Sequence, residues 1–176
     1  MITTYPVIEE VLLAYRSVLG NDYHKYRNHV YRVFLNCLLL DANGDHAEKY
    51  AYAAAFHDIG IWTNQTIDYL EPSISQACSY LAAKEKNELI ADITLMIYWH
   101  HKVKPYKGIS ETIVENFRRA DWIDVSLGLL HFKTDKKEIS KNRTAFPNLG
   151  FHWFLIKKIF SNFFRNPLHP LPMFRK

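Results

Sequence analysis

Helix-breaking residues are sparse in this chain, and their scarcity restricts its fold more than any other feature. The 176 residues include six glycines and seven prolines, and four of the prolines come after residue 140. Glycine and proline destabilise a helix interior most, so most of the sequence is free to be helical. No convincing alternation of apolar and polar residues predicts β-strands. We therefore expect an all-α fold.

Apolar residues at helical spacing, with start and stop signals, predict seven helices. The helices are expected over residues 6–19, 22–40, 46–58, from 73 onward, 87–101, after 110 and through 116–130, and 151–164. Ser73 and Gln76 resemble a capping box that opens the fourth helix, and Gly60 is expected to end the third. With 48% hydrophobic residues the chain has enough apolar surface for a core. We predict a single domain over residues 1–176, a bundle of about six to seven helices.

Cysteine usage and the N-terminal sequence bear on the compartment. Cys37 and Cys78 lie inside apolar helical patterns without the spacing of a zinc or redox pair, so we expect buried free thiols. The start "MITTYPVIEEV" lacks the basic and apolar regions of a signal peptide, and no apolar run approaches the roughly 20 residues of a membrane span. These features predict a cytoplasmic location.

Positive charge is concentrated in the last quarter of the chain. From residue 133 onward there are ten Lys or Arg against two Asp or Glu, a net charge of +8, whereas the whole chain carries +4. The aromatic and basic segment 151–165 would suit an anionic membrane or a nucleic acid. Its wide apolar arc favours instead a helix that closes over the core or meets a second copy in a homodimer. The proline-spaced tail, 166–176, is expected to lie on the surface or to be mobile.

The stretch "AAAFHDIGIW", residues 53–62, places His57 beside Asp58 where an alanine-rich helix is about to end. Neutral imidazoles and carboxylates bind divalent metals, and a functional site needs several of them to converge. Small alanine side chains let another helix approach closely. A helix about to end at a glycine also relaxes the 100° divergence between adjacent residues. A metal site is therefore the hypothesis, provided that partners exist.

Two other predicted helices offer partners. His29 shares a polar stripe with Lys25, Arg32 and Asn36, which is either a solvated face or the wall of a pocket for metal and anion. Asp121 lies within "RRADWIDVSLGLL" between apolar neighbours. Such an aspartate is poorly explained as an exposed residue, so we expect it to meet a cation.

His29, the pair His57 and Asp58, and Asp121 follow one another as H…HD…D. They resemble the signature of the HD-domain superfamily of metal-dependent phosphohydrolases, and "HDIG" and "ADWID" are similar to its usual surroundings. The resemblance covers about residues 22–130. It implies an all-α fold with one divalent ion bound by these four residues. The metal, Mn, Co, Mg, Zn, Fe or Ni, stays open because such ligands accept all of them.

The segment "YWHHK", residues 98–102, adds His100, which should point inward, and His101, which lies further round the helix. Some superfamily members use extra histidines for a second metal. Residues 59–99 contain no histidine, so one main metal is favoured here, with Asp68 or Glu71 as possible oxygen donors. We predict that His100 contacts substrate or protonates the leaving group, with a metal ligand or a structural role as the alternatives. No segment resembles the GYP loop of members that cleave cyclic dinucleotides.

The resemblance implies hydrolysis of a small phosphomonoester or nucleotide by attack of a metal-bound water. Asp58 would orient that water or take its proton, and Arg32 is the preferred cation for the phosphoryl oxygens. The other predicted substrate contacts are Lys25, His101, Lys102, Lys104, Arg118 and Asp124. Two alternatives stay open: an iron or zinc oxygenase or hydratase of a small organic molecule, and a non-catalytic nucleotide-binding regulatory module. No nucleic-acid or membrane partner is clearly indicated.

Overall fold

The computed structural model describes residues 2–41 and 43–165, which contain helices and loops but no β-strand, as the sequence predicted. The tail 166–176, expected to lie on the surface or to be mobile, is outside the described residues. In order, the elements are α1 (Pro6–Ala14), α2 (Arg16–Leu19), the 3-10 helix η1 (Gly20–Asp22), α3 (Tyr23–Leu40), α4 (Ala47–Phe56), α5 (Gly60–Thr63), α6 (Leu70–Ala83), α7 (Asn87–Trp99), α8 (Glu111–Val125), α9 (Lys136–Ala145) and α10 (Phe151–Arg165).

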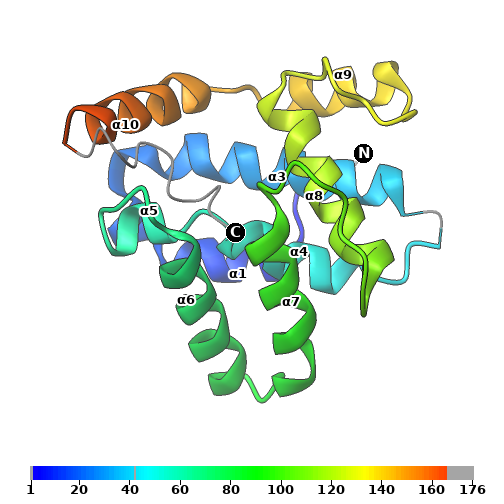
Figure 1. The fold of residues 1–176 in the computed structure, drawn as a ribbon, viewed down its shortest axis with the longest axis horizontal. Coiled ribbons are helices and arrows are strands. Elements are labelled where there is room, and N and C mark those ends of the chain that lie inside the picture. Colours follow the sequence, from blue (N-terminus) through cyan, green and yellow to red (C-terminus); the bar gives the residue numbers. More distant parts are fainter. Residues whose placement is uncertain (1, 42, 166–176) are drawn as a thin grey trace.

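Helix α3 is the central element, and α8, α4, α9 and α10 all pack against it (Figure 1). Its apolar face, which includes Val30, Phe34 and Cys37, is fully buried. Of the polar stripe predicted on this helix, His29, Arg32 and Asn36 are buried too and Lys25 is half-buried, because Arg32 and Asn36 point into the α3–α8 interface rather than into solvent. One helix therefore supplies both a hydrophobic core face and a buried polar seam.

Helices α6 and α7 form an antiparallel hairpin that projects from the rest of the molecule (Figure 1). The chain turns between them over residues 84–86, where Glu85 takes a positive φ of 58° and the Lys86 amide donates to the Leu81 carbonyl. Both helices pack against α4. The hairpin thereby returns the chain so that His100, directly after α7, lies at the end of α4.

In the N-terminal half, two predicted helix boundaries differ from those in the structure. The first helix, expected over residues 6–19, is interrupted at Tyr15, whose hydroxyl donates to Gln76 Oε1 at 2.8 Å and whose ring meets Phe56 edge to face. The predicted capping box is wrong. Ser73 lies within α6, fully buried, and its hydroxyl oxygen accepts a hydrogen bond from the Gly60 amide at 2.9 Å.

Gly60 was expected to end a helix, but it begins α5, and α4 has already ended at Phe56. Glycine is required here by close packing. A Cβ atom at this position would lie 2.5 Å from the Tyr69 carbonyl oxygen and 3.0 Å from the Ser73 amide nitrogen. The turn 57–59 and α5 are thus fixed against the start of α6.

The region after α8 was also predicted differently. The helix expected to continue through residue 130 ends at Val125, because Leu127 and Gly128 take positive φ angles of 58° and 83° and the Gly128 amide closes onto the Ile123 carbonyl. Helix α9 was not predicted at all. Its sequence is polar, and within the described structure only Ile139 and Asn142 of this helix are buried. The described chain consequently has ten α-helices, more than the six to seven expected.

Helix α10 lies along α3, as expected for a helix that closes over the core (Figure 1). Phe151 is fully buried, and Phe154 stacks on Trp62 with ring centroids 5.2 Å apart. Trp153 and Phe160 on its other side are each 60% exposed. Across the described residues, no helix combines the length and the apolar character that a membrane crossing needs.

Candidate metal centre

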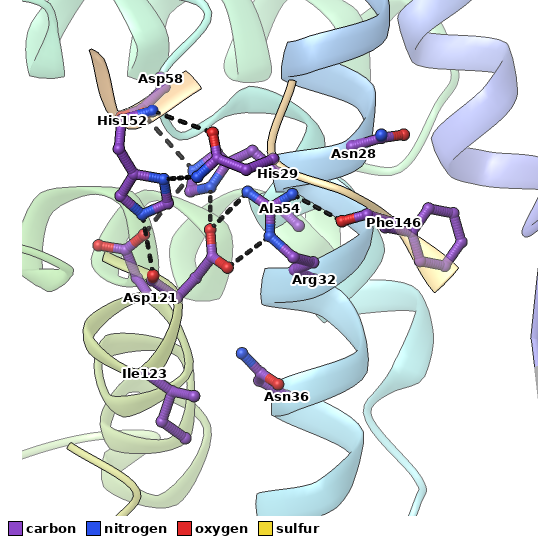
Figure 2. Close-up of polar contacts among 12 residues, drawn as sticks. Asn28, His29, Arg32, Asn36, Ala54, Asp58, Asp121, Ile123, Phe146 and His152 are labelled. Carbon is purple, nitrogen blue, oxygen red and sulfur yellow. Dashed lines mark hydrogen bonds and ion pairs between the residues drawn. The ribbon is translucent and has the colours of Figure 1, made fainter. Parts of the chain in front are cut away.

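The four residues of the H…HD…D pattern lie close together and buried, and Figure 2 labels three of them, His29, Asp58 and Asp121. His29 comes from the middle of α3, His57 and Asp58 from the turn that ends α4, and Asp121 from α8. The two Nε2 atoms of the histidines are 2.9 Å apart. Asp58 Oδ2 lies 3.6 Å from His29 Nε2 and 3.5 Å from His57 Nε2, and Asp121 Oδ1 lies 3.8 and 3.7 Å from the same atoms.

The other ring nitrogen of each histidine fixes which atom faces the cluster. His57 Nδ1 is 2.8 Å from the Ala54 carbonyl oxygen, and His29 Nδ1 is 2.7 Å from Asp124 Oδ2. Because both partners are acceptors, both rings carry their proton on Nδ1. The two Nε2 atoms face each other at 2.9 Å, so either a proton on His29 Nε2, which donates to His57 Nε2, or a cation between them links the rings. Metal-binding histidines are held in this way by a carbonyl or carboxylate.

The separations also suit a ligand set. Metal–ligand bonds of about 2.0–2.2 Å, typical of imidazole and carboxylate donors, place neighbouring ligand atoms about 3.0–3.6 Å apart. Five of the six separations among the four ligand atoms, all except that between Asp58 and Asp121, run from 2.9 to 3.8 Å. The chemistry of the donors, their protonation and their spacing therefore all fit a metal ion, and the His/Asp group could hold one.

Burial and neighbouring charges shift the pKa values of the four clustered residues in different directions. Burial lowers the pKa of His57 to about 3, so its ring is neutral. Burial would lower the pKa of His29 as well, but Asp124 and Asp58 outweigh it and raise the value to about 9. Burial opposes the charged form of Asp58, yet the adjacent histidines hold its pKa well below its usual value. Burial raises the pKa of Asp121 to about 6.

Arg32 has a different role from the predicted one. Its Nε donates to Asp124 Oδ1 at 2.5 Å, its Nη2 to Asp124 Oδ2 at 2.9 Å and its Nη1 to the Phe146 carbonyl at 2.9 Å (Figure 2). Arg32 is only 2% exposed. Its guanidinium is therefore engaged in holding Asp124 rather than open to a phosphoryl group. Asp124, predicted to contact substrate, instead accepts from Arg32 and from His29 Nδ1 and so orients a metal-facing imidazole.

A second group of possible ligands shares Asp58 with the first. His100 Nδ1 is 2.6 Å from the Ile97 carbonyl oxygen, and its Nε2 faces Asp58 Oδ1 at 3.6 Å. Within the described structure, both of these facing atoms are buried and lack a hydrogen-bond partner. His101 completes the group, and its Nε2 is hydrogen-bonded to the Tyr69 hydroxyl. The structure thus brings both histidines of "YWHHK" to the cluster.

The remaining predicted substrate contacts lie elsewhere. Lys25 forms an ion pair with Asp22 at 2.7 Å. Arg118 donates to both oxygens of Glu115 and to the carbonyl of Lys102, whose own Nζ lies over a tyrosine ring. Three residues offered as further cations or oxygen donors are exposed: Lys104, Asp68 and Glu71. The structure therefore places none of these charges among the converging histidines and aspartates.

Sequence reasoning missed residues that complete the surroundings of the cluster. The Phe151 ring stacks on the His29 ring with centroids 4.1 Å apart, and His152 Nε2 donates to the Asp124 carbonyl at 3.0 Å. Tyr69, 2% exposed, lies against His100 and His101. The only sequence signal for the contacts of Phe151 and His152 was the histidine inside the aromatic run "FHW", because these two residues lie far from the H…HD…D pattern in sequence.

Comparisons of this chain with models of protein families, with curated proteins and with solved structures found no match.

Proposed function

We propose that the protein is a metal-dependent hydrolase of a small phosphomonoester, of the HD-domain type. The observation that carries the proposal is the convergence of two imidazole Nε2 atoms and two carboxylates in a site where no residue is more than 3% exposed. Each imidazole is held from behind by an acceptor, so its Nε2 faces the cluster and would be available to a cation.

His29, His57, Asp58 and Asp121 would hold the ion, which when bound would lower the pKa of a coordinated water and polarise a phosphoryl oxygen. Asp58 is the residue best placed to orient that water, because its Oδ1 faces away from the first histidine pair. Its low pKa makes it a weak base, so it would accept a hydrogen bond from the water rather than remove the proton.

His100 has two roles compatible with its position. Burial opposes its charged form, but Asp58 raises its pKa, so a protonated Nε2 could donate to the leaving-group oxygen. Alternatively its Nε2, with Asp58 Oδ1 and His101, would bind a second ion that shares Asp58 with the first. This second arrangement is the specific support for the alternative of an iron-dependent oxygenase, since oxygen chemistry is one use of paired irons.

The test begins with metal content. We would measure metals by elemental analysis after loading with Mn, Co, Zn or Fe, and phosphate release from aryl and alkyl phosphates. The variants are His57→Ala and, as a matched control, His24→Ala, because His24 is exposed. We expect roughly one to two ions per chain in the wild type and the control, little in His57→Ala, and phosphate release that follows metal content.

Each other outcome points to a different function. Metal without phosphate release, but with oxygen consumption by the iron form, would replace the hydrolase with the oxygenase. No metal in the wild type would overturn both. A nucleotide that raises the melting temperature without being cleaved would then support the regulatory module.

A further inference from the structure

A small cavity opens onto the candidate metal centre. It has a volume of about 120 Å³ and lies between α8, α10 and the loop before α6. Its lining residues are Ile67, Tyr69, His101, Asp121, Trp122, Val125, Leu155 and Ile159. Tyr69, His101 and Asp121 belong to the metal centre or contact it, whereas the other five side chains are largely apolar. One end of the cavity is therefore lined by polar residues at the metal centre, and the other end is lined by hydrophobic side chains.

Two of the larger cavities of the described residues are lined by basic side chains. One of about 430 Å³ includes Lys136 and Arg143, and one of about 570 Å³ includes Lys157 and Lys158. Neither contains any of the four residues that would bind the metal. They would suit anions, but a molecule held there would not reach the converging ligands. The small apolar cavity is thus the better candidate for a substrate group next to the reacting bond.

The size of the cavity limits what can enter. An engineered apolar cavity of about 150 Å³ in another protein binds benzene, whereas pockets for drug-sized molecules measure about 300–1,000 Å³. A volume of about 120 Å³ matches one aromatic ring or a short branched alkyl group, and it is too small for a nucleoside. The apolar walls would leave the hydroxyl groups of a sugar without hydrogen-bond partners.

We propose that this cavity holds the non-reacting part of the substrate, which is a compact aryl or alkyl group. The inference rests on the proposed phosphomonoesterase function and narrows its substrate to esters of small apolar alcohols or phenols. In the reaction, a water oxygen bonds to phosphorus and the bond from phosphorus to the ester oxygen breaks. One proton of the water ends on the released alcohol or phenol and the other on the phosphate.

Helix α10 offers a matched pair of variants. Ile159 lines the cavity, whereas Ile156 lies on the outer side of the same helix and is 41% exposed. Ile159→Trp should fill the cavity, and Ile156→Trp is the control. Should Ile159→Trp fail to fold, Val125→Phe reaches the cavity from α8, where Val125 is 40% exposed and tolerates a larger side chain.

The kinetic test compares kcat/KM for phenyl phosphate, methyl phosphate, glycerol phosphate and adenosine monophosphate. We expect phenyl phosphate to exceed glycerol phosphate and the nucleotide by roughly 10- to 200-fold, the range that pocket contacts supply. Ile159→Trp should lower the value for phenyl phosphate at least tenfold and change that for methyl phosphate less than about twofold. Ile156→Trp should change neither.

A binding measurement separates this inference from the proposed function. Benzene and phenol binding to the wild type and to Ile159→Trp would be followed by ligand-observed NMR, without any turnover. Binding that is lost in Ile159→Trp while no ester is hydrolysed would support the cavity as a subsite and overturn the phosphomonoesterase. Hydrolysis of all four esters at similar rates, unchanged in Ile159→Trp, together with no benzene binding, would overturn the cavity and leave the phosphomonoesterase standing.

Discussion

Asp124→Asn tests whether the residue behind His29 controls metal binding. In the wild type, Asp124 Oδ2 accepts from His29 Nδ1 and Arg32 Nη2, and Oδ1 accepts from Arg32 Nε. An asparagine of the same shape has one amide nitrogen in place of one oxygen. In either orientation that nitrogen meets a donor. Where it faces His29, the ring must move its proton to Nε2, and that nitrogen is then closed to a metal.

The magnitude follows from burial. Arg32 is 2% exposed, so its charge would stay buried after its anionic partner is removed, and breaking such a pair costs about 3–5 kcal/mol. The substitution should also weaken metal binding, an effect separate from the loss of stability. Loss of a partner behind a ligand typically lowers metal affinity by about 10- to 100-fold. At about 1.4 kcal/mol per tenfold change, this is roughly 1.4–2.8 kcal/mol of binding free energy.

Two assays keep the effects apart. Urea unfolding of the metal-free protein measures stability, and competition with a chelating dye measures metal affinity. Asp135→Asn is the matched control. Asp135 is an exposed N-cap residue whose side chain accepts from the Lys137 amide, a position where asparagine is equally good. If folded Asp124→Asn bound metal as tightly as the wild type, the orienting role assigned to Asp124 would be refuted.

Three further predictions concern stability. Phe151→Ala should lower the free energy of unfolding in urea by about 3–5 kcal/mol, because the Phe151 ring is fully buried against His29. The control Phe164→Ala should change it by less than about 0.5 kcal/mol, because Phe164 is 80% exposed. Equal effects of the two substitutions would contradict the described packing of α10. Gly60→Ala should destabilise the protein by about 1–3 kcal/mol, because the new methyl group would lie 2.5 Å from the Tyr69 carbonyl oxygen. An unchanged urea midpoint would show that the turn 57–59 can shift to accommodate the methyl group. Burial alone would raise the pKa of Glu115, but hydrogen bonds from the Arg118 guanidinium lower this pKa below its usual value. The Glu115 carboxylate therefore stabilises the fold fully above its unfolded pKa of about 4.3, and this contribution is lost as the pH falls through the folded pKa. Urea midpoints measured from pH 7 to pH 3 should therefore fall more steeply in the wild type than in Glu115→Gln, and parallel curves would contradict the assigned shift.

The sequence predicted those features that depend on local pattern. Helix periodicity located α3, α7 and α10, and the order H…HD…D selected four residues that do meet. Prediction failed where packing between distant segments decides the outcome. Ser73 has the sequence of an N-cap, but the approach of Gly60 makes it a buried acceptor inside α6. Helix α9 has almost no apolar periodicity and is recognisable only once α3 is in place beside it.

The roles of charged residues were the hardest to predict. Arg32 was expected to face a phosphate because it lies one turn from His29 on the same helix face. In the structure the guanidinium is hydrogen-bonded to Asp124 of α8, a partner that the helix pattern did not indicate. Sequence distance separates these two residues by 92 positions, and only the pairing of α3 with α8 reveals their contact.

The stacking of Phe151 on His29 has a consequence for timing. All four residues that would hold the metal precede the end of α8, whereas the aromatic ring that covers His29 comes from α10. The cover of His29 therefore comes from a helix that carries none of the four ligands. An ion already in place would then be enclosed, and it would exchange with solution only as often as α10 opens locally. The lifetime of a bound ion would then depend on local opening of α10 as well as on the strength of the coordination bonds.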